Sequence, residues 1–238
     1  MRKLFLVLTL SSFALSTLLA QDNWDKDKKK IEPSGNIITK EVNVTSFDQL
    51  DVSGVFSLML VQGNKEEVKI EADDNLQPLF EVKNEGTKLT ISMKKDVNIQ
   101  GKIKMKVYVT FKKLKSMDLK TVGNVISEAN MSFDDLDINN KSVGNVDLKL
   151  TTQKLNIENK SVGNVKLNGK ADNVTIKNKG VGSLQAAGFI VQTMDIDNSG
   201  VGSAEVNAEK ALKVKDSFLG KVSNKGSATI KRMNKVVI

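Results

Sequence analysis

The sequence predicts an all-β protein whose larger part is a single-stranded β-helix, a β-solenoid that we expect to be right-handed, with rungs of about 20 residues. Three columns of residues, visible when the second half of the chain is written in rows, carry this prediction. The first is the motif Val122-Gly123-Asn124-Val125, which recurs with substitutions five more times. Its glycines are 21, 19, 19, 20 and 18 residues apart, at Gly123, Gly144, Gly163, Gly182, Gly202 and Gly220.

The second and third columns keep phase with the glycines. Four residues before each of the last five glycines is an amide or an acid: Asn140, Asn159, Asn178, Asn198 and Asp216. Two residues earlier is an aliphatic: Ile138, Ile157, Ile176, Ile196 and Val214. Units this short cannot bury an apolar face alone, so we expect the isoleucines to stack at the strand spacing of about 4.8 Å. A helical repeat is disfavoured, because the rows are rich in Asn, Gly and β-branched residues.

The Asn and Asp column is interpreted as a structural ladder. Stacked amide side chains can bond from rung to rung, and Asn tolerates the corner conformations of a rung. The alternative, a Ca²⁺ site built from the same oxygens, is weaker, because the glycine-rich, aspartate-bearing nonapeptide of calcium-binding β-rolls is absent. The repeated glycine fits a backbone position with positive φ or a close approach. We therefore expect no metal and no cofactor.

A short column of lysines follows the Asn column by one residue, at Lys141, Lys160 and Lys179. Three like charges in register repel one another, so we expect them to point outward. Such a stripe commonly just keeps a protein edge soluble, and the alternative is that it binds a ligand. It is the candidate binding stripe that the sequence offers.

The chain before the repeat has longer strands and fewer turns. We divide the sequence into a signal peptide (1–20), a polar linker (21–46), a wider N-terminal β lobe (47–113) and the repeat lobe (114–238). Alternation places Met105, Val107, Val109 and Phe111 on one face, which we expect to pack on the solenoid. Residues 75–80, which include Pro78, predict a single helical turn. Ser53-Gly54-Val55 is similar to the later motif. The alternative interpretation is therefore that the first half forms wider rungs of the same sheet and not a separate domain.

Residues 1–20 read as a secretory signal. Arg2 and Lys3 precede the apolar run Leu4–Leu10, and small residues lead to a cleavage site after Ala20, with a second site after Ser16 as the alternative. A transmembrane anchor is disfavoured, because the run is shorter than the roughly 20 residues that a span needs. No later stretch reaches that length. We expect an exported chain, located in the periplasm, at the cell surface or outside the cell.

Composition narrows the chemistry further. The 238 residues include no Cys and no His, which excludes disulfides, thiol nucleophiles, His-dependent triads and ordinary zinc sites. The formal charge of +8 includes Arg2 and Lys3 of the signal. The remaining basic residues are interleaved with acids, so we expect no nucleic-acid partner.

Several segments resemble the GIN domain, the family of autotransporter adhesin heads. The similarity rests on the opening Phe47–Phe56, the turn Gln62-Gly63, the stretch Glu71–Leu76, the turn Gly86–Leu89 and the Val-Gly-Asn repeats, and it extends from Phe47 to Val222. The resemblance implies an exported bacterial β-helical protein, commonly from the Bacteroidetes, with two lobes. It supplies no catalytic residues.

Three functions follow for such a chain. The first is a non-catalytic, adhesin-like head that binds a surface glycan or a protein, since stacked rungs present a long surface without a deep pocket. The second is a polysaccharide-active enzyme, which needs convergent acids in a groove. The only tight acidic group after the first strand of the repeats, Asp134, Asp135 and Asp137, is better interpreted as a rung corner. The third is a structural component of the cell envelope.

Overall fold

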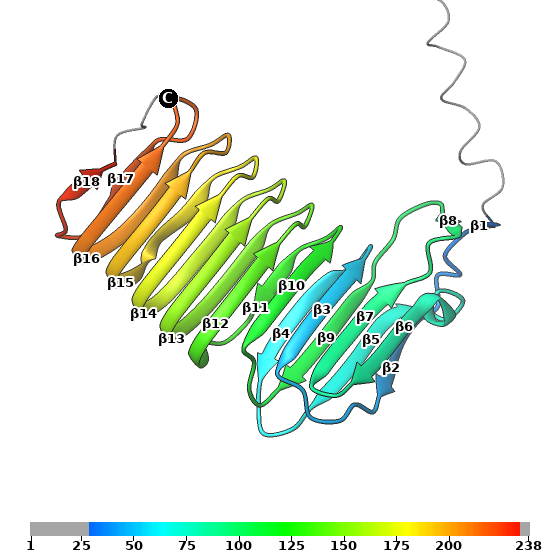
Figure 1. Cartoon of the computed structure of the whole chain (residues 1–238). Helices are drawn as coiled ribbons and strands as arrows, with labels where there is room; N and C mark the ends of the chain where they lie inside the picture. The colour runs from blue at the N-terminus through cyan, green and yellow to red at the C-terminus, as the bar shows by residue number, and fades with distance from the viewer. Residues whose placement is uncertain (1–28, 234–238) are drawn as a thin grey trace, which may run out of the picture. The chain divides into compact units, whose positions relative to one another are not determined.

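The computed structural model describes residues 29–233 (Figure 1), and the expected signal peptide lies outside this range. The chain divides into two units, residues 1–33 with 95–103 and residues 34–94 with 104–238. In the described part of the smaller unit, β1 (Lys29–Ile31) pairs in parallel with β8 (Val97–Ile99). No helix within residues 29–233 is long and apolar enough to cross a membrane.

The N-terminal part of the larger unit is a mixed sheet. Its strands are β2 (Ile37–Val42), β3 (Gln49–Gly54), β4 (Ser57–Gln62), β5 (Glu67–Asp73), β6 (Phe80–Glu85), β7 (Lys88–Met93) and β9 (Lys106–Phe111). The pairs β2–β5, β5–β9 and β6–β7 are antiparallel. The expected helical turn is the 3₁₀ helix η1 (Gln77–Leu79), in which Pro78 fits because the first turn needs no N–H donor. Met105, Val107, Val109 and Phe111 are all buried, as the alternation predicts.

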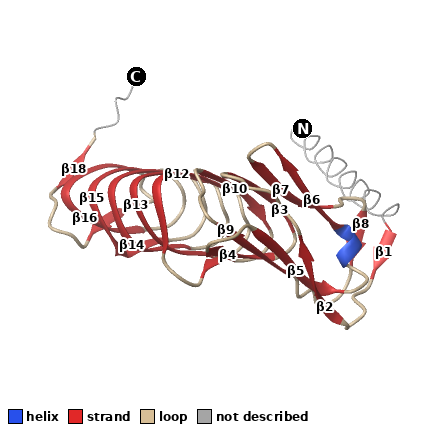
Figure 2. Ribbon diagram, turned by 90° about the horizontal axis from the view of Figure 1, so that it is seen from below, coloured by secondary structure: helices blue, strands red, loops and turns tan. Residues whose placement is uncertain are grey.

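The repeat lobe is a parallel β-helix. Its strands are β10 (Ser116–Thr121), β11 (Val125–Ser127), β12 (Met131–Asn140), β13 (Val146–Asn159), β14 (Val165–Asn178), β15 (Leu184–Asn198), β16 (Ala204–Asp216), β17 (Val222–Asn224) and β18 (Ile230–Arg232). In Figure 2 the ribbons of β12 to β16 bend and lie side by side as successive turns of one coil, and their pairings are parallel. The all-β solenoid prediction is confirmed.

The register of these strands places the aliphatic column as expected. Ile138 lies opposite Ile157, Ile157 opposite Ile176, and the column continues through Ile196 to Val214. All five side chains are buried. Rung-to-rung stacking of β-branched side chains therefore builds a continuous core.

The column also extends back into the first half of the chain. Strand β3 pairs in parallel with β10, with Leu50 opposite Met117, and β4 pairs in parallel with β11. Phe111 of β9 stacks on Phe133 of β12 with ring centroids 6.1 Å apart. The two halves thus share one core, and β3 and β4 form an additional rung.

Two features differ from the sequence-based expectations. Residues 21–46, expected as a polar linker, include β1 and β2, and β2 pairs with β5 along its whole length. This edge strand has five exposed residues of six, so it lacks the buried alternation that would have marked it. Each row of the repeat also contains two short runs of β-formers, such as Leu155–Ile157 and Val162–Leu167, which predict two short strands, yet β13 and β14 are single bent strands of 14 residues.

Candidate binding surface

A buried chain of asparagine side chains joins four rungs. The Nδ2 of Asn140 donates to Oδ1 of Asn159 at 2.8 Å, and Asn159 donates to Asn178 at 2.7 Å. Asn178 donates in turn to Asn198 at 2.6 Å. All four side chains are buried. The amide of the preceding rung occupies the Oδ1 atoms of Asn159, Asn178 and Asn198, and burial shields the column from solvent.

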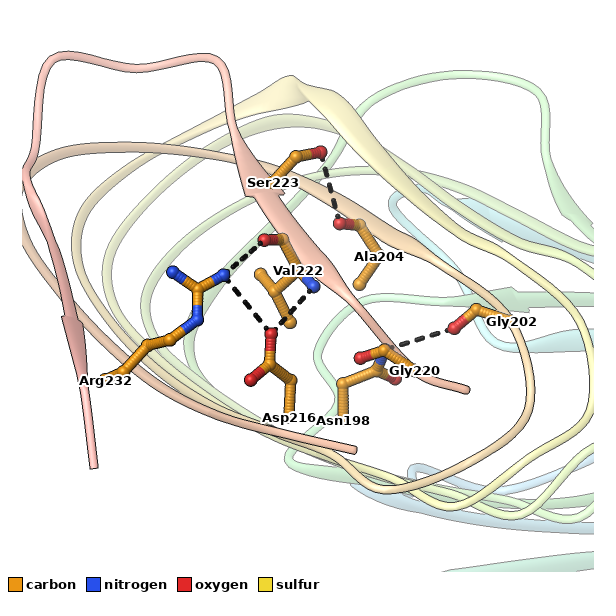
Figure 3. Close-up of polar contacts among 8 residues, drawn as sticks. All are labelled: Asn198, Gly202, Ala204, Asp216, Gly220, Val222, Ser223 and Arg232. Carbon is orange, nitrogen blue, oxygen red and sulfur yellow. Dashed lines mark hydrogen bonds and ion pairs between the residues drawn. The ribbon is translucent and has the colours of Figure 1, made fainter. Parts of the chain in front are cut away.

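Asp216 stands next in the column but takes no part in the amide chain (Figure 3). Asn198 donates to the carbonyl oxygens of Gly220 at 2.6 Å and Gly202 at 3.1 Å. The Oδ2 of Asp216 instead accepts from the backbone N–H of Val222 at 3.2 Å and from Nη2 of Arg232 at 3.3 Å. The amide chain therefore ends at Asn198, whose Nδ2 donates to backbone carbonyl oxygens and not to the carboxylate of Asp216.

A second ladder uses the Asn of the repeated motif. The Oδ1 atoms of Asn124, Asn145 and Asn164 each accept the backbone N–H of the equivalent residue on the next rung, at 3.0, 3.0 and 2.9 Å. These side chains are exposed. Sequence reasoning recorded the motif without assigning this residue, although an Asn fixed at one position of a repeat was the available signal.

The three lysines of the candidate stripe are all exposed and follow the buried Asn column by one residue. Lys160 forms an ion pair with Glu158, with 2.6 Å between Nζ and Oε1. The hydrogen bond from Lys160 holds the pKa of Glu158 below its usual value, and the charges of Lys141 and Lys177 act in the same direction. The stripe is therefore a solvated basic edge on three successive rungs.

Two residues beyond the lysines is an apolar column that the sequence reasoning missed, which we call the valine ridge. Its valines are 49% to 52% exposed and align by parallel bridges; its members are Val122, Val143, Val162, Val181, Val201 and the 60% exposed Leu219. The glycine that follows each valine has φ between 130° and 150°. At Gly163 an added Cβ would overlap the carbonyl oxygen of Gly144, so the backbones of adjacent corners are in close contact.

A polar hollow of about 500 Å³ lies on the outer face of β7, β3, β10, β12, β13 and β14. Buried aliphatic positions such as Leu50 and Ile157 contribute to its floor. Its polar lining combines acids, amides, hydroxyls and lysines: Gln49, Asp51, Lys88, Ser116, Asp118, Asp137, Asn139, Asn156, Glu158, Thr175 and Lys177.

Most charged groups of the hollow have an ion-pair or hydrogen-bond partner, either in the hollow or beside it. Asp51 lies 3.2 Å from Lys88 and 3.4 Å from Lys120, which also lies 2.8 Å from Asp118. The Nδ2 of Asn156 donates to Asp137 at 2.7 Å. The Oδ1 of Asn139 is shielded from solvent and accepts no hydrogen bond within the described part of the chain.

This arrangement favours hydrogen bonding over acid catalysis. A general acid needs a raised pKa, whereas that of Glu158 is lowered by Lys160. Within residues 29–233, no three acidic side chains gather closely enough to hold a metal ion. Of the expected acidic group, only Asp137 lines the hollow; Asp134 and Asp135 are two consecutive exposed residues within β12.

Solved structures share this fold. The chain is 32% identical to a "putative adhesin" of Bacteroides fragilis, with a TM-score of 0.73 over 85% of this chain and 100% of that one. A "putative adhesin" of Parabacteroides merdae (19% identity, TM-score 0.54) and a "putative lipid binding protein" of Parabacteroides distasonis (18%, 0.59) each align over 87% of this chain and 100% of theirs.

No similar protein was found among curated proteins. Residues 46–228 match the family described as "Putative auto-transporter adhesin, head GIN domain". This match includes strands β3 to β17 and the polar hollow. The chain belongs to the GIN domain family of auto-transporter adhesin heads.

Proposed function

We propose that the chain is an exported, non-catalytic binding module that holds a glycan in the polar hollow. The observation that carries the proposal is the side-by-side placement of carboxylates and amides on adjacent parallel strands. Asp137 and Asn156, for example, lie 2.7 Å apart between Oδ1 and Nδ2. Acceptor and donor groups at this spacing match neighbouring hydroxyls of a sugar ring, each of which both donates and accepts.

The hollow is also preorganised. Its polar side chains stand on strands that are bonded on both sides, so little conformational freedom is lost when a ligand binds. Among the lining residues no aromatic ring is present for stacking on a sugar, so single-site affinity rests on hydrogen bonds and is modest. An adhesive head gains strength from many copies on one surface.

The relatives support a binding role. The family and the Bacteroides fragilis structure carry the name adhesin. The basic and apolar start of the sequence supports export, which would bring the module to extracellular glycans. A polysaccharide-active enzyme has less support, because Asp51 and Asp118 are engaged by Lys120 and the pKa of Glu158 is lowered.

The test is binding of the purified protein to an array of bacterial and host glycans. The variant Asp137→Ala/Asn156→Ala removes the paired groups of the hollow. The control Asp172→Ala/Asn173→Ala removes an exposed acid and amide of β14 that lie outside it. We expect the hollow variant to lose at least about ten-fold in affinity, as removal of two hydrogen bonds implies, with the control unchanged.

Two outcomes would contradict the proposal. If both variants keep the wild-type signal, the ligand binds elsewhere. If the wild type retains no glycan but captures a protein in the same format, the hydroxyl-recognition argument fails. Thermal unfolding of both variants checks that any loss of binding is not a loss of fold.

A further inference from the structure

The valine ridge is the most extended exposed apolar feature within residues 29–233. It has one aliphatic side chain on each of six successive rungs, which at the strand spacing corresponds to a line of about 24 Å. Single exposed aliphatic residues are ordinary, but a contiguous line of them indicates a contact surface. The line ends at Leu219, beside Phe218, whose ring is 89% exposed.

The ridge is flanked by basic residues. Lys141, Lys160 and Lys179 are exposed two residues before Val143, Val162 and Val181, and the exposed Lys221 follows Leu219 by two residues. Three acids lie near this edge, Glu158, Asp197 and Asp216, and they are in ion pairs with Lys160, Lys215 and Arg232 respectively. The net charge beside the ridge is therefore positive.

We propose that the valine ridge is a docking surface for an anionic lipid bilayer. A straight apolar line with lysines along one side, ending in an exposed Phe and Leu, matches the boundary between headgroups and acyl chains. The rungs hold the ridge rigid, so the valines contact the interface along its length while Phe218 and Leu219 enter it at one end. The lysines contact the lipid phosphates.

A second copy of this chain is the alternative occupant of the ridge. Two ridges packed antiparallel would bring their lysine columns together, and like charges at a contact oppose association. A bilayer carrying anionic headgroups supplies the opposite charge and the apolar layer together. This surface is separate from the polar hollow, whose lining includes none of the ridge residues, so either proposal can fail alone.

The test is co-sedimentation of the purified protein with vesicles of phosphatidylcholine alone and of phosphatidylcholine containing phosphatidylglycerol. We expect binding only to the anionic vesicles. The variant Lys141→Ser/Lys160→Ser/Lys179→Ser should bind them roughly a hundred-fold more weakly, given the usual contribution of a lysine at an anionic surface. The control Lys154→Ser/Lys170→Ser/Lys210→Ser removes three exposed lysines from other parts of the rungs and should bind like wild type.

The apolar part is tested by Phe218→Ser/Leu219→Ser, in which both side chains are exposed and the fold is kept. Added salt screens the charges of the lysines but not the apolar contacts. Wild-type binding that persists at high salt should therefore be lost in the Phe218→Ser/Leu219→Ser variant. Equal binding by the two lysine variants, or no binding of wild type to anionic vesicles, would overturn the proposal. So would a concentration-dependent dimer in sedimentation that Val143→Thr/Val162→Thr/Val181→Thr dissociates.

Discussion

The Nδ2 of Asn178 donates to Oδ1 of Asn198 on the next rung at 2.6 Å, and both side chains are buried. The same polarity runs from Asn140 through Asn159, so Asn159 and Asn178 each donate to the next rung and accept from the rung before. The direction is set at the end of the helix, where Asn198 donates to the carbonyl oxygen of Gly220. An internal asparagine of the ladder therefore forms one hydrogen bond with the asparagine on each of the two neighbouring rungs.

Replacing Asn178 with Ala should be costly for this reason. The change leaves Nδ2 of Asn159 and Oδ1 of Asn198 without their partners in a buried place, and each orphaned group costs about 1–3 kcal/mol. We expect the free energy of unfolding in urea to fall by about 2–4 kcal/mol. Asn164→Ala is the control, because its exposed Oδ1 accepts only the N–H of Ser183, which water can replace. Equal losses for the two variants would show that burial does not decide the cost.

The register of the rungs could be predicted from the sequence because it depends on a column that repeats in phase. A slip of one residue would turn Ile157 or Ile176 toward solvent, so the hydrophobic pattern alone fixes the pairing. The amide chain followed from the same alignment. The end of the amide chain could not be predicted in this way, because the hydrogen bonds of Asp216 and Arg232 depend on the geometry of the last, incomplete rung.

The polar hollow could not be predicted in the same way. Its lining joins Asp137 and Asn156 of the repeat to Gln49 and Lys88, which belong to strands outside the repeat. Nothing in the local sequence says that β3 inserts between β7 and β10. The valine ridge was missed for another reason: a Val beside a Gly suggests strand propensity, and only the turn geometry exposes the side chain.

A charge in the aliphatic column should unfold the repeat lobe. Ile176 is buried between Ile157 and Ile196, whereas its neighbour Thr175 is exposed on the other face of β14. Ile176→Asp buries a carboxylate without a partner, at a cost of several kcal/mol, while Thr175→Asp adds the same charge to the surface. We expect a large drop in the urea midpoint for the first and little change for the second. Similar midpoints would contradict the stacked core.

Glycine at the rung corner is required by close contact as well as by its backbone angle. Gly163 has φ 135°, and a Cβ there would overlap the carbonyl oxygen of Gly144. Gly86 has φ 57°, and a Cβ added to it would have no other atom within 4 Å. Gly86→Ala should therefore cost only about 1–2 kcal/mol of unfolding free energy, the usual penalty for the left-handed region. Gly163→Ala must also separate two rungs, and its thermal midpoint should fall well below that of Gly86→Ala.

Acid should destabilise the protein through carboxylates that the fold keeps charged. The Nζ of Lys115 lies 2.7 Å from Oδ2 of Asp48, and this hydrogen bond, with a second from Thr87, lowers the pKa of Asp48 below its usual value. The pKa values of Glu67, Asp74 and Glu158 are lowered as well, chiefly by hydrogen bonds from Lys65, Ser34 and Lys160 respectively.

A lowered folded-state pKa gives stability that is present above the unfolded value and is lost as the pH falls through the folded value. The unfolding free energy should therefore be nearly constant around neutral pH and decline below about pH 4.5, where the unfolded carboxyls begin to bind protons. Urea titrations at a series of pH values measure this. Asp48→Asn should flatten the acid limb, since its side chain no longer titrates. Asp172→Asn, at an exposed acid outside these pairs, should leave the limb unchanged, and equal slopes in the two variants would contradict the role of the Asp48–Lys115 pair.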